Sequence, residues 1–223
     1  YEDKMMEIID DRKDMGVKAI TFSGGGEPFT YRYFNKTIKK IIDKKMTFAS
    51  LTNGSNLSGE IVELFALNAT WLRISIDGYD DESYAKSRDV KIGEFTKVIN
   101  NMKFFAAIKG RTCNLGVSFI VDDKNYSKIY EFSKLIKDIG VDSIKLSGCI
   151  VANEGEKNNE YHADFYDKAK NENKVDKPFY FIHEVWRNLR VGIVSNTVNP
   201  QAKTMHRHLF GIKNQQNAKT SLV

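Results

Sequence analysis

The sequence predicts an α/β protein built on a sheet of parallel strands, either a barrel or a doubly wound sheet. Amphipathic helical segments alternate with short apolar segments five times, and the strands follow one another at intervals of about 25 to 40 residues. Polar or glycine-containing turns follow the strands. In parallel α/β folds such turns gather at the carboxyl edge of the sheet, so a site is expected there.

The helices and strands can be placed individually. Helices are expected where apolar residues recur at helical spacing among charged ones, over residues 2–15, 33–45, 58–67, 95–108 and 129–139. Ser58 is the candidate N-cap of the third helix. Strands are expected at short apolar or alternating runs, over residues 17–23, 46–51, 71–76, 113–121 and 142–146.

The regular pattern ends near Ala152. A short helix is expected within residues 153–177, a helix or mixed segment at 179–189, and a short strand at 191–194. From Asn196 onward, no periodicity predicts an element. The last third of the chain is therefore expected to be less regular than the part before it.

Composition and charge limit the classes of function. The 223 residues are 41% hydrophobic, which allows a sizeable core and excludes wholesale disorder. The 34 basic and 29 acidic residues are spread through the chain, so we expect solvated helix faces and no nucleic-acid surface. No run approaches the roughly 20 apolar residues of a membrane span, and no signal peptide is recognised. The two isolated cysteines, Cys113 and Cys149, favour a reducing compartment, and we expect a cytoplasmic protein.

Three short motifs lie at the carboxyl ends of successive strands. They are Ser23-Gly24-Gly25-Gly26-Glu27-Pro28, Thr52-Asn53-Gly54 and Arg73-Ile74-Ser75-Ile76-Asp77-Gly78. Glycine backbone at the end of a strand lets a ligand come close. Ser75 and Asp77 are two residues apart on one strand, so their side chains leave the same face and need polar partners there. Glycine turns of this kind also bind phosphate in unrelated (β/α) barrel enzymes, and the residues alone leave that alternative open.

In this order and spacing, the motifs resemble those of radical S-adenosylmethionine (SAM) enzymes, and look most like the branch of peptide- and sulfatase-maturating members. The resemblance covers about residues 1–150. It implies a partial (β/α)6 TIM-like barrel of parallel strands over residues 1–151, with a C-terminal extension over residues 152–223. It also implies an enzyme that reductively cleaves SAM at a [4Fe–4S] cluster and abstracts hydrogen from its substrate.

The resemblance implies SAM contacts for nine residues, and no catalytic residue is assigned. Gly24, Gly25 and Gly26 match the motif whose backbone carbonyl accepts a hydrogen bond from the SAM amino group. Ser75 is expected to contact the ribose or the methionine carboxylate, and Arg88, on the following loop, to bind that carboxylate. The other candidates are Glu27, Asn53 and Asp77, which could instead hold turns, and Leu146, which is expected against the adenine.

The CxxxCxxC pattern, which binds the cluster in this family, is absent from the 223 residues. Cys113 and Cys149 lie far apart and follow the glycine motif, so they cannot replace three thiolates on one loop. The cluster ligands are expected upstream of Tyr1, together with the first strand. A relative that has lost its cluster and acts as a binding module is the alternative. The four histidines, at positions 162, 183, 206 and 208, lack ligand spacing, so no metal site is expected within the chain.

The resemblance leaves the substrate and the reaction type open. In this family the final third and the loops over the barrel mouth set the substrate, and here those regions give no clear pattern. The implied partners are a peptide or small-molecule substrate and an electron donor such as flavodoxin or ferredoxin.

Overall fold

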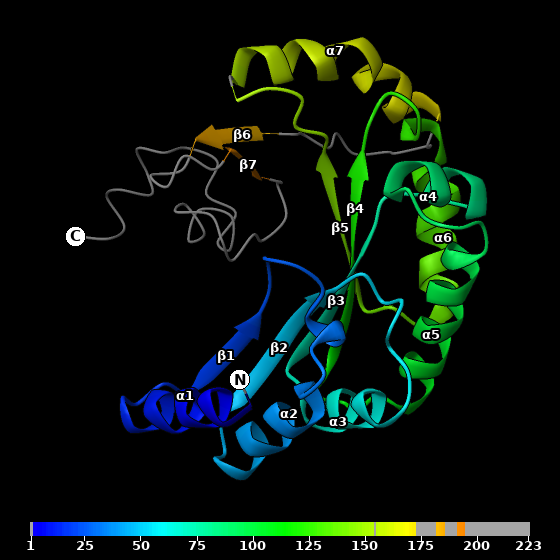
Figure 1. Ribbon diagram of the computed structural model, residues 1–223. Helices are drawn as coiled ribbons and strands as arrows, with labels where there is room; N and C mark the ends of the chain where they lie inside the picture. Colours follow the sequence, from blue (N-terminus) through cyan, green and yellow to red (C-terminus); the bar gives the residue numbers. More distant parts are fainter. Residues whose placement is uncertain (1, 154, 173–181, 186–190, 195–223) are drawn as a thin grey trace. The chain divides into compact units, whose positions relative to one another are not determined.

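The computed structural model describes residues 2–153, 155–172, 182–185 and 191–194 (Figure 1). Its strands are β1 (Ala19–Phe22), β2 (Thr47–Thr52), β3 (Trp71–Ile76), β4 (Asn114–Val121), β5 (Ser143–Gly148), β6 (Ile182–Val185) and β7 (Val191–Val194). Its helices are α1 (Glu2–Asp14), α2 (Phe34–Asp43), α3 (Glu60–Asn68), α4 (Asp81–Arg88), α5 (Glu94–Ile108), α6 (Ile129–Ile139) and α7 (Gly155–Glu172). Two short 3-10 helices are η1 (Pro28–Thr30) and η2 (Tyr126–Lys128).

The first five strands form one sheet in the order β1-β2-β3-β4-β5. The pairs β1–β2, β2–β3 and β3–β4 are parallel, and β5 points the same way as β4 (Figure 1). A doubly wound sheet reverses its strand order at a switch point, whereas a barrel keeps the strands in chain order. The fold is therefore α/β with five parallel strands, consistent with the partial TIM-like barrel that was expected.

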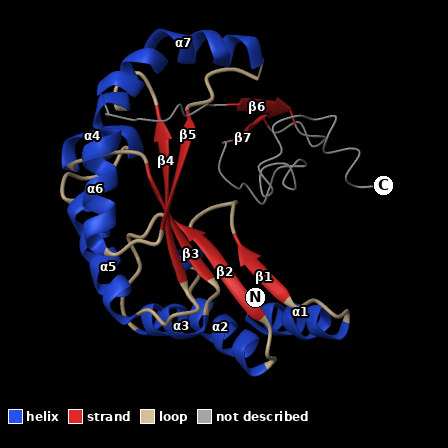
Figure 2. Ribbon diagram, turned by 180° about the vertical axis from the view of Figure 1, so that it is seen from behind, coloured by secondary structure: helices blue, strands red, loops and turns tan. Residues whose placement is uncertain are grey.

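One face of the sheet packs against helices. On β3, Leu72, Ile74 and Ile76 are fully buried, and the residues that alternate with them are half-buried. Alternation places the two sets on opposite faces of the sheet. Figure 2 shows α2, α3, α5 and α6 along one side of the strands. Phe48 of β2 contacts Phe65 of α3 with ring centroids 5.0 Å apart, which joins the helical layer to the sheet.

Most elements agree with their predicted ranges. β3 and α6 begin and end at the expected residues, and the other predicted elements before Ala152 differ by one or two residues at their ends. The prediction of Ser58 as a helix cap is wrong, because α3 begins at Glu60 and its N-cap is Gly59, which has no side chain to make a hydrogen bond. Glycine is tolerated at this position at a small cost relative to serine.

The placement of Arg88 on a loop is also wrong, because Arg88 is the last residue of the short helix α4. The helix begins with a capping box. The Asp80 carboxylate accepts a hydrogen bond from the Ser83 N–H at 2.7 Å, and the Ser83 hydroxyl accepts one from the Asp80 N–H at 3.1 Å. These bonds satisfy backbone groups that a helix start leaves unpaired, so a mainly polar segment can form a helix.

The chain divides into two compact units. One contains Tyr1–Phe119 and Glu131–Lys145, and the other contains Ile120–Tyr130 and Leu146–Val223. In the second unit α7 has 18 residues and is longer than expected, and Phe165 on it stacks on Tyr126 at 5.5 Å. The predicted division at residues 151 and 152 stays a prediction.

Two short strands follow α7 in sequence. β6 and β7 pair in antiparallel orientation. β7 confirms the strand predicted at residues 191–194. The segment predicted at 179–189 contains β6, and the rest of it lies outside the described residues.

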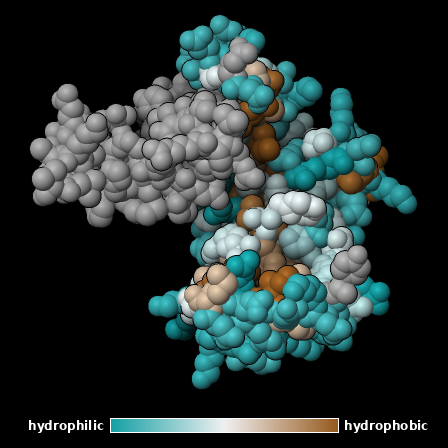
Figure 3. Space-filling view, turned by 60° about the vertical axis from the view of Figure 1, so that its left-hand side comes forward, coloured by the Kyte–Doolittle hydropathy of each residue, from teal (hydrophilic) through white to brown (hydrophobic). Residues whose placement is uncertain are grey.

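The face of the described part that Figure 3 shows is mainly hydrophilic. In the space-filling view of one face, hydrophilic residues cover most of the described area (Figure 3). Large exposed apolar residues such as Leu67 and Phe104 come from different helices, which is ordinary for a folded surface. No helix within the described ranges has the length and apolar character needed to span a membrane.

Gly78 joins β3 to α4 and leaves no room for a side chain. A Cβ built on Gly78 would lie 2.5 Å from the backbone N and Cα of Tyr84. Backbone atoms of a capped helix cannot move away without displacing the helix. We expect Gly78→Ala to lower the free energy of unfolding by about 1–3 kcal/mol, measured by urea denaturation.

Gly155→Ala is the matched control for this substitution. A Cβ at Gly155, in the first turn of α7, meets nothing within 4 Å. Its effect on the free energy of unfolding should stay within about 0.5 kcal/mol. Equal stability of the Gly78→Ala and Gly155→Ala proteins would contradict the close packing of α4 on this turn.

Candidate active site

The glycine motif forms an open loop at the carboxyl end of β1. Gly24, Gly25 and Gly26 have φ angles of 75°, 68° and 139°, a region that side chains other than glycine adopt with strain. A Cβ built on any of the three meets no described atom within 4 Å. The backbone conformation, and not crowding, therefore accounts for the three glycines, and their peptide groups lie open to a ligand.

Glu27 ties this loop to the neighbouring strand. Its carboxylate accepts hydrogen bonds from the Thr52 hydroxyl at 2.6 Å, the Asn53 N–H at 2.7 Å and the Phe29 N–H at 3.1 Å. Both oxygens are used, and two of the three donors lie at the end of β2. Of the two roles considered for Glu27, the geometry favours holding the turn.

Asn53 also takes part in a turn. Its Oδ1 accepts a hydrogen bond from the Ser55 N–H at 2.9 Å, an arrangement typical of an Asx turn. Its Nδ2 donates no hydrogen bond to any residue within the described ranges, so this half-buried amide keeps a donor for a ligand.

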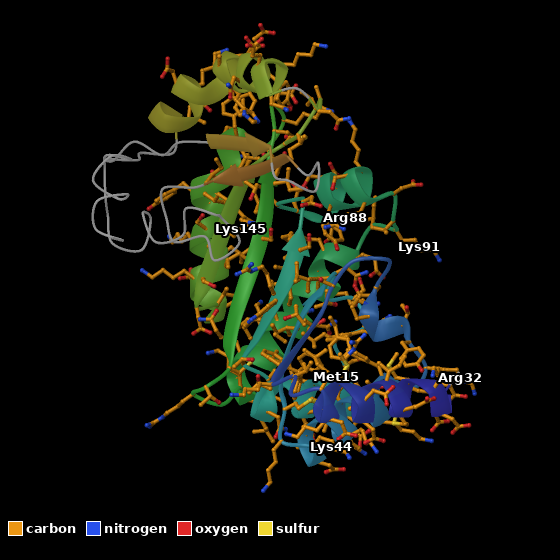
Figure 4. All side chains as sticks on the ribbon, turned by 90° about the vertical axis from the view of Figure 1, so that its left-hand side faces the viewer. Met15, Arg32, Lys44, Arg88, Lys91 and Lys145 are labelled. Carbon is orange, nitrogen blue, oxygen red and sulfur yellow. The ribbon has the colours of Figure 1, made fainter. Side chains whose placement is uncertain are left out.

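Ser75, Asp77 and Arg88 come together at the carboxyl end of β3. Nη2 of Arg88 donates to the Ser75 hydroxyl at 2.9 Å and to the Ser75 carbonyl at 3.2 Å, and it lies 2.6 Å from Oδ2 of Asp77. Both side chains on the strand contact one guanidinium, as expected of residues that leave the same face. Figure 4 labels Arg88 on α4. Lys86, two residues before Arg88 on the same helix, is exposed.

The guanidinium of Arg88 keeps capacity for a further partner. Its Nε is buried and has no hydrogen-bond partner within the described ranges. A buried donor without an acceptor is unfavourable, and a planar guanidinium binds carboxylates and phosphates through paired N–H groups. The arrangement can therefore bind an anionic group, while Asp77 and Ser75 fix the orientation of the guanidinium.

Leu146 and Cys113 were also singled out in the sequence. Leu146 is half-buried on β5, in the second compact unit. Cys113 is buried, and burial raises the pKa of its thiol to about 11, so it stays protonated near neutral pH. No group of three or more metal-ligating side chains exists within the described part of the chain.

Of the four histidines, only His162 has its side chain within the described structure. Nε2 of His162 lies 3.0 Å from the Cys149 carbonyl oxygen, and burial lowers the pKa of this imidazole while that hydrogen bond partly opposes the shift. These are the surroundings of a packed core histidine. His183 belongs to β6 with its side chain outside the described structure, and His206 and His208 lie outside the described residues.

Sequence reasoning missed Thr52 and the helical setting of Arg88. The hydroxyl of Thr52 donates to Glu27 and also accepts a hydrogen bond from the Gly54 N–H at 3.0 Å, so it joins two motifs that are distant in sequence. No local pattern points to that contact. A local signal for α4 did exist in Asp80 followed three residues later by Ser83, a spacing typical of helix caps.

We expect Glu27→Ala to destabilise the protein. The substitution leaves the Asn53 N–H and the Thr52 hydroxyl without their acceptor, which should lower the free energy of unfolding by about 1–3 kcal/mol in urea denaturation. Glu63→Ala, on the exposed face of α3, is the control and should change the free energy of unfolding by no more than about 0.5 kcal/mol. Equal effects of the two substitutions would rule out Glu27 as the connection between β1 and β2.

Three curated relatives show what the chain resembles. It is 33% identical over 92 residues to an S-adenosylmethionine-dependent nucleotide dehydratase of Lacinutrix mariniflava, covering 41% of this chain and 18% of the relative. It is 30% identical over 159 residues to a pre-heme d1 synthase of Dinoroseobacter shibae, covering 71% of this chain and 38% of the relative. It is 24% identical over 152 residues to a tungsten-containing aldehyde ferredoxin oxidoreductase cofactor-modifying protein of Pyrococcus furiosus, covering 66% of this chain and 43% of the relative. The chain spans less than half the length of each.

Solved structures share the fold at low sequence identity. The Streptococcus suis protein SuiB matches with a TM-score of 0.56 and 17% identity, covering 75% of this chain and 40% of SuiB. TYW1 with a bound lysine-pyruvate adduct matches with a TM-score of 0.53 and 17% identity, covering 87% of this chain and 66% of TYW1. At this identity the likeness shows the fold alone.

Two family models match the chain. One, described as a virion DNA-directed RNA polymerase domain, matches residues 152–210, most of which lie outside the described residues. The other, the radical SAM superfamily, matches residues 2–136, which is more than half of the chain. The matched range includes Arg88 and all three motifs, of which the first contains the glycine loop. The chain therefore belongs to the radical SAM superfamily.

Proposed function

We propose that the protein is an enzyme that reductively cleaves SAM at a [4Fe–4S] cluster and abstracts a hydrogen atom from a peptide or small-molecule substrate. Membership of the superfamily supports SAM-dependent radical chemistry. The observation that carries the proposal for this chain is the buried Nε of Arg88, held beside Ser75 and Asp77 without an acceptor of its own. The methionine carboxylate of SAM would supply that acceptor.

The residues at the carboxyl edge of the sheet suit the polar end of SAM. The open carbonyl groups of Gly24, Gly25 and Gly26 can accept hydrogen bonds from the amino group, because glycine backbone allows a close approach. Glu27 acts as a positioning residue that holds this loop against β2. Asp77 fixes Arg88, and the free amide donor of Asn53 faces no protein acceptor within the described ranges.

Other contacts are proposed from family resemblance and from the chemistry of the side chains. Ser75 would contact the ribose or the methionine carboxylate, and Leu146 would lie against the adenine. When bound, SAM supplies the 5′-deoxyadenosyl group that abstracts hydrogen. The protein's own residues bind and orient SAM and limit the access of water.

The residues of this chain do not fit the cluster. A [4Fe–4S] cluster needs several thiolates close together, and the chain has only Cys113 and Cys149. Cys113 is buried, and its raised pKa opposes thiolate formation. The cluster's ligands are therefore not among these 223 residues, and the reductive step is proposed for the whole protein.

The substrate and the electron donor are proposed by class. A solved structure of SuiB contains a precursor peptide, and the curated relatives named above include a nucleotide dehydratase. We therefore propose a peptide or a small metabolite as substrate, and flavodoxin or ferredoxin as electron donor. The cytoplasm suits both a reduced cluster and free thiols.

Anaerobic reconstitution of the full-length protein tests the proposal. The protein is incubated with iron, sulfide and a reductant, SAM is added, and 5′-deoxyadenosine is measured by liquid chromatography. We expect cluster absorbance and formation of 5′-deoxyadenosine that depends on the reductant. SAM binding without a cluster or cleavage would favour the alternative of a binding module, and the absence of both would refute the proposal.

Arg88→Lys tests the carboxylate contact. Lysine keeps a positive charge beside Asp77 but loses the planar pair of N–H groups, so the Kd for SAM should rise about tenfold. The matched control is Lys86→Arg, the reverse exchange on the exposed face of the same helix, which should leave the Kd unchanged. An unchanged Kd in Arg88→Lys, measured by isothermal titration calorimetry, would remove Arg88 from the SAM site.

A further inference from the structure

A second cationic feature lies on the face of the sheet opposite the helices. Arg73 of β3 is half-buried and alternates with the fully buried Leu72 and Ile74, so it projects from the other face. Ser75 projects from this same face two residues further along β3. Two residues along a strand span about 7 Å. Arg73 therefore lies about 7 Å from Ser75 along β3, on the side away from the carboxyl edge of the sheet.

Gly116 of β4 makes room for the guanidinium of Arg73. The two residues are directly paired in the sheet. A Cβ built on Gly116 would lie 3.4 Å from Nε of Arg73 and 3.0 Å from Oγ of Ser143 on β5. The space that a side chain would occupy is thus shared by groups from the strands on either side, and a glycine inside a strand is typical of such close approach.

Lys145 belongs to the same face. It follows Ser143 by two residues on β5, so its side chain leaves the sheet on the side of Ser143 and Arg73. Burial lowers the pKa of the Lys145 ammonium, and the positive charge of Arg73 lowers it further. Burial also lowers the pKa of Arg73. Figure 4 labels Lys145 on β5. The two half-buried cations, from different strands, therefore lie close enough for their charges to interact.

The protein does not neutralise this pair within the described ranges. No carboxylate there lies within 4.0 Å of either cation, in contrast to Arg88, which pairs with Asp77. The guanidinium of Arg73 lies over the ring of Trp71, with Cζ 5.5 Å from the ring centroid. Two neighbouring like charges with reduced hydration are unfavourable, and an anion between them would remove that cost.

We propose that Arg73 and Lys145 bind an anionic group of the substrate, a phosphate or a carboxylate, on the face of the sheet below Ser75. The fork of the Arg73 guanidinium suits two oxygens of such a group, and the Lys145 ammonium supplies a second positive charge. This inference deepens the proposed function, because it takes the anion to be part of the substrate. It restricts the class of substrate to molecules whose anionic group lies about 7 Å from the portion of the substrate that lies beside Ser75.

Two probes test the site by isothermal titration calorimetry on the full-length protein. Pyrophosphate represents the phosphate source and succinate the carboxylate source. We expect one of them to bind with one site per chain and with an affinity that falls as sodium chloride is added. Tighter binding of pyrophosphate identifies a phosphate, and tighter binding of succinate identifies a carboxylate.

Arg73→Gln and Lys145→Gln should each weaken binding of the preferred probe about tenfold or more, since each removes a charge-assisted contact. The control is Lys103→Gln, on the exposed face of α5, which should leave the binding of the probe unchanged. Each of the two test substitutions also removes one of two neighbouring positive charges. The melting temperature should therefore stay the same or rise, which separates loss of binding from loss of folding.

Three outcomes would overturn the inference. They are no binding of either probe, binding that both glutamine variants leave unchanged, and displacement of the bound probe by SAM, which would assign the cations to SAM itself. The assay needs no SAM cleavage, so its result is independent of the test for 5′-deoxyadenosine. Probe binding in a protein that does not cleave SAM would refute the proposed reaction and leave the anion site in place.

Discussion

The carboxylate of Glu27 fixes the ends of two neighbouring strands against each other. The glycine loop after β1 has three residues at positive φ and no described atoms packed around its α-carbons, so its own contacts do not hold it. Its position depends on its ends. Glu27 provides one fixed end by accepting hydrogen bonds from Thr52 and Asn53, which belong to β2 and its turn. The open backbone of the loop is thus presented from a rigid edge.

The alternation of side chains along the strands produces both the core and the site. On β3 the same six residues supply three fully buried apolar side chains to the helical layer and three half-buried ones to the opposite face. A shift of one residue in pairing would bury Arg73 and expose Ile74. The polar face is therefore as strongly specified as the core, because one register determines both.

The charges on that polar face are balanced in different ways. Arg88 is neutralised by Asp77 and held by Ser75, so its orientation is set before any ligand arrives. Arg73 and Lys145 have no such carboxylate within the described ranges, and the charge of Arg73 adds to burial in lowering the pKa of Lys145. A preorganised cation favours accurate placement of a ligand group, whereas an unbalanced pair favours strong attraction of one.

Local patterns in the sequence predicted the fold well and the site in part. Apolar periodicity located five strands and most helices, the motifs located Ser75 and Asp77 at the end of one strand, and the family resemblance indicated Arg88. The contact of Glu27 with Thr52 was not predictable, because it joins residues 25 positions apart through a loop whose backbone only the structure gives. Helix α4 was missed because Tyr84 is its single buried residue, so it has little apolar periodicity to detect.

The strand order has a consequence for how the chain folds. Each of β2 to β5 lies beside the strand that precedes it in sequence. Each pairing thus spans a single crossover, which is the shortest separation that two parallel strands allow. During synthesis, a newly completed unit finds its partner strand already present, because the N-terminal part is made first. The sheet can therefore grow one unit at a time on the ribosome, with each of β2 to β5 pairing with the strand made before it.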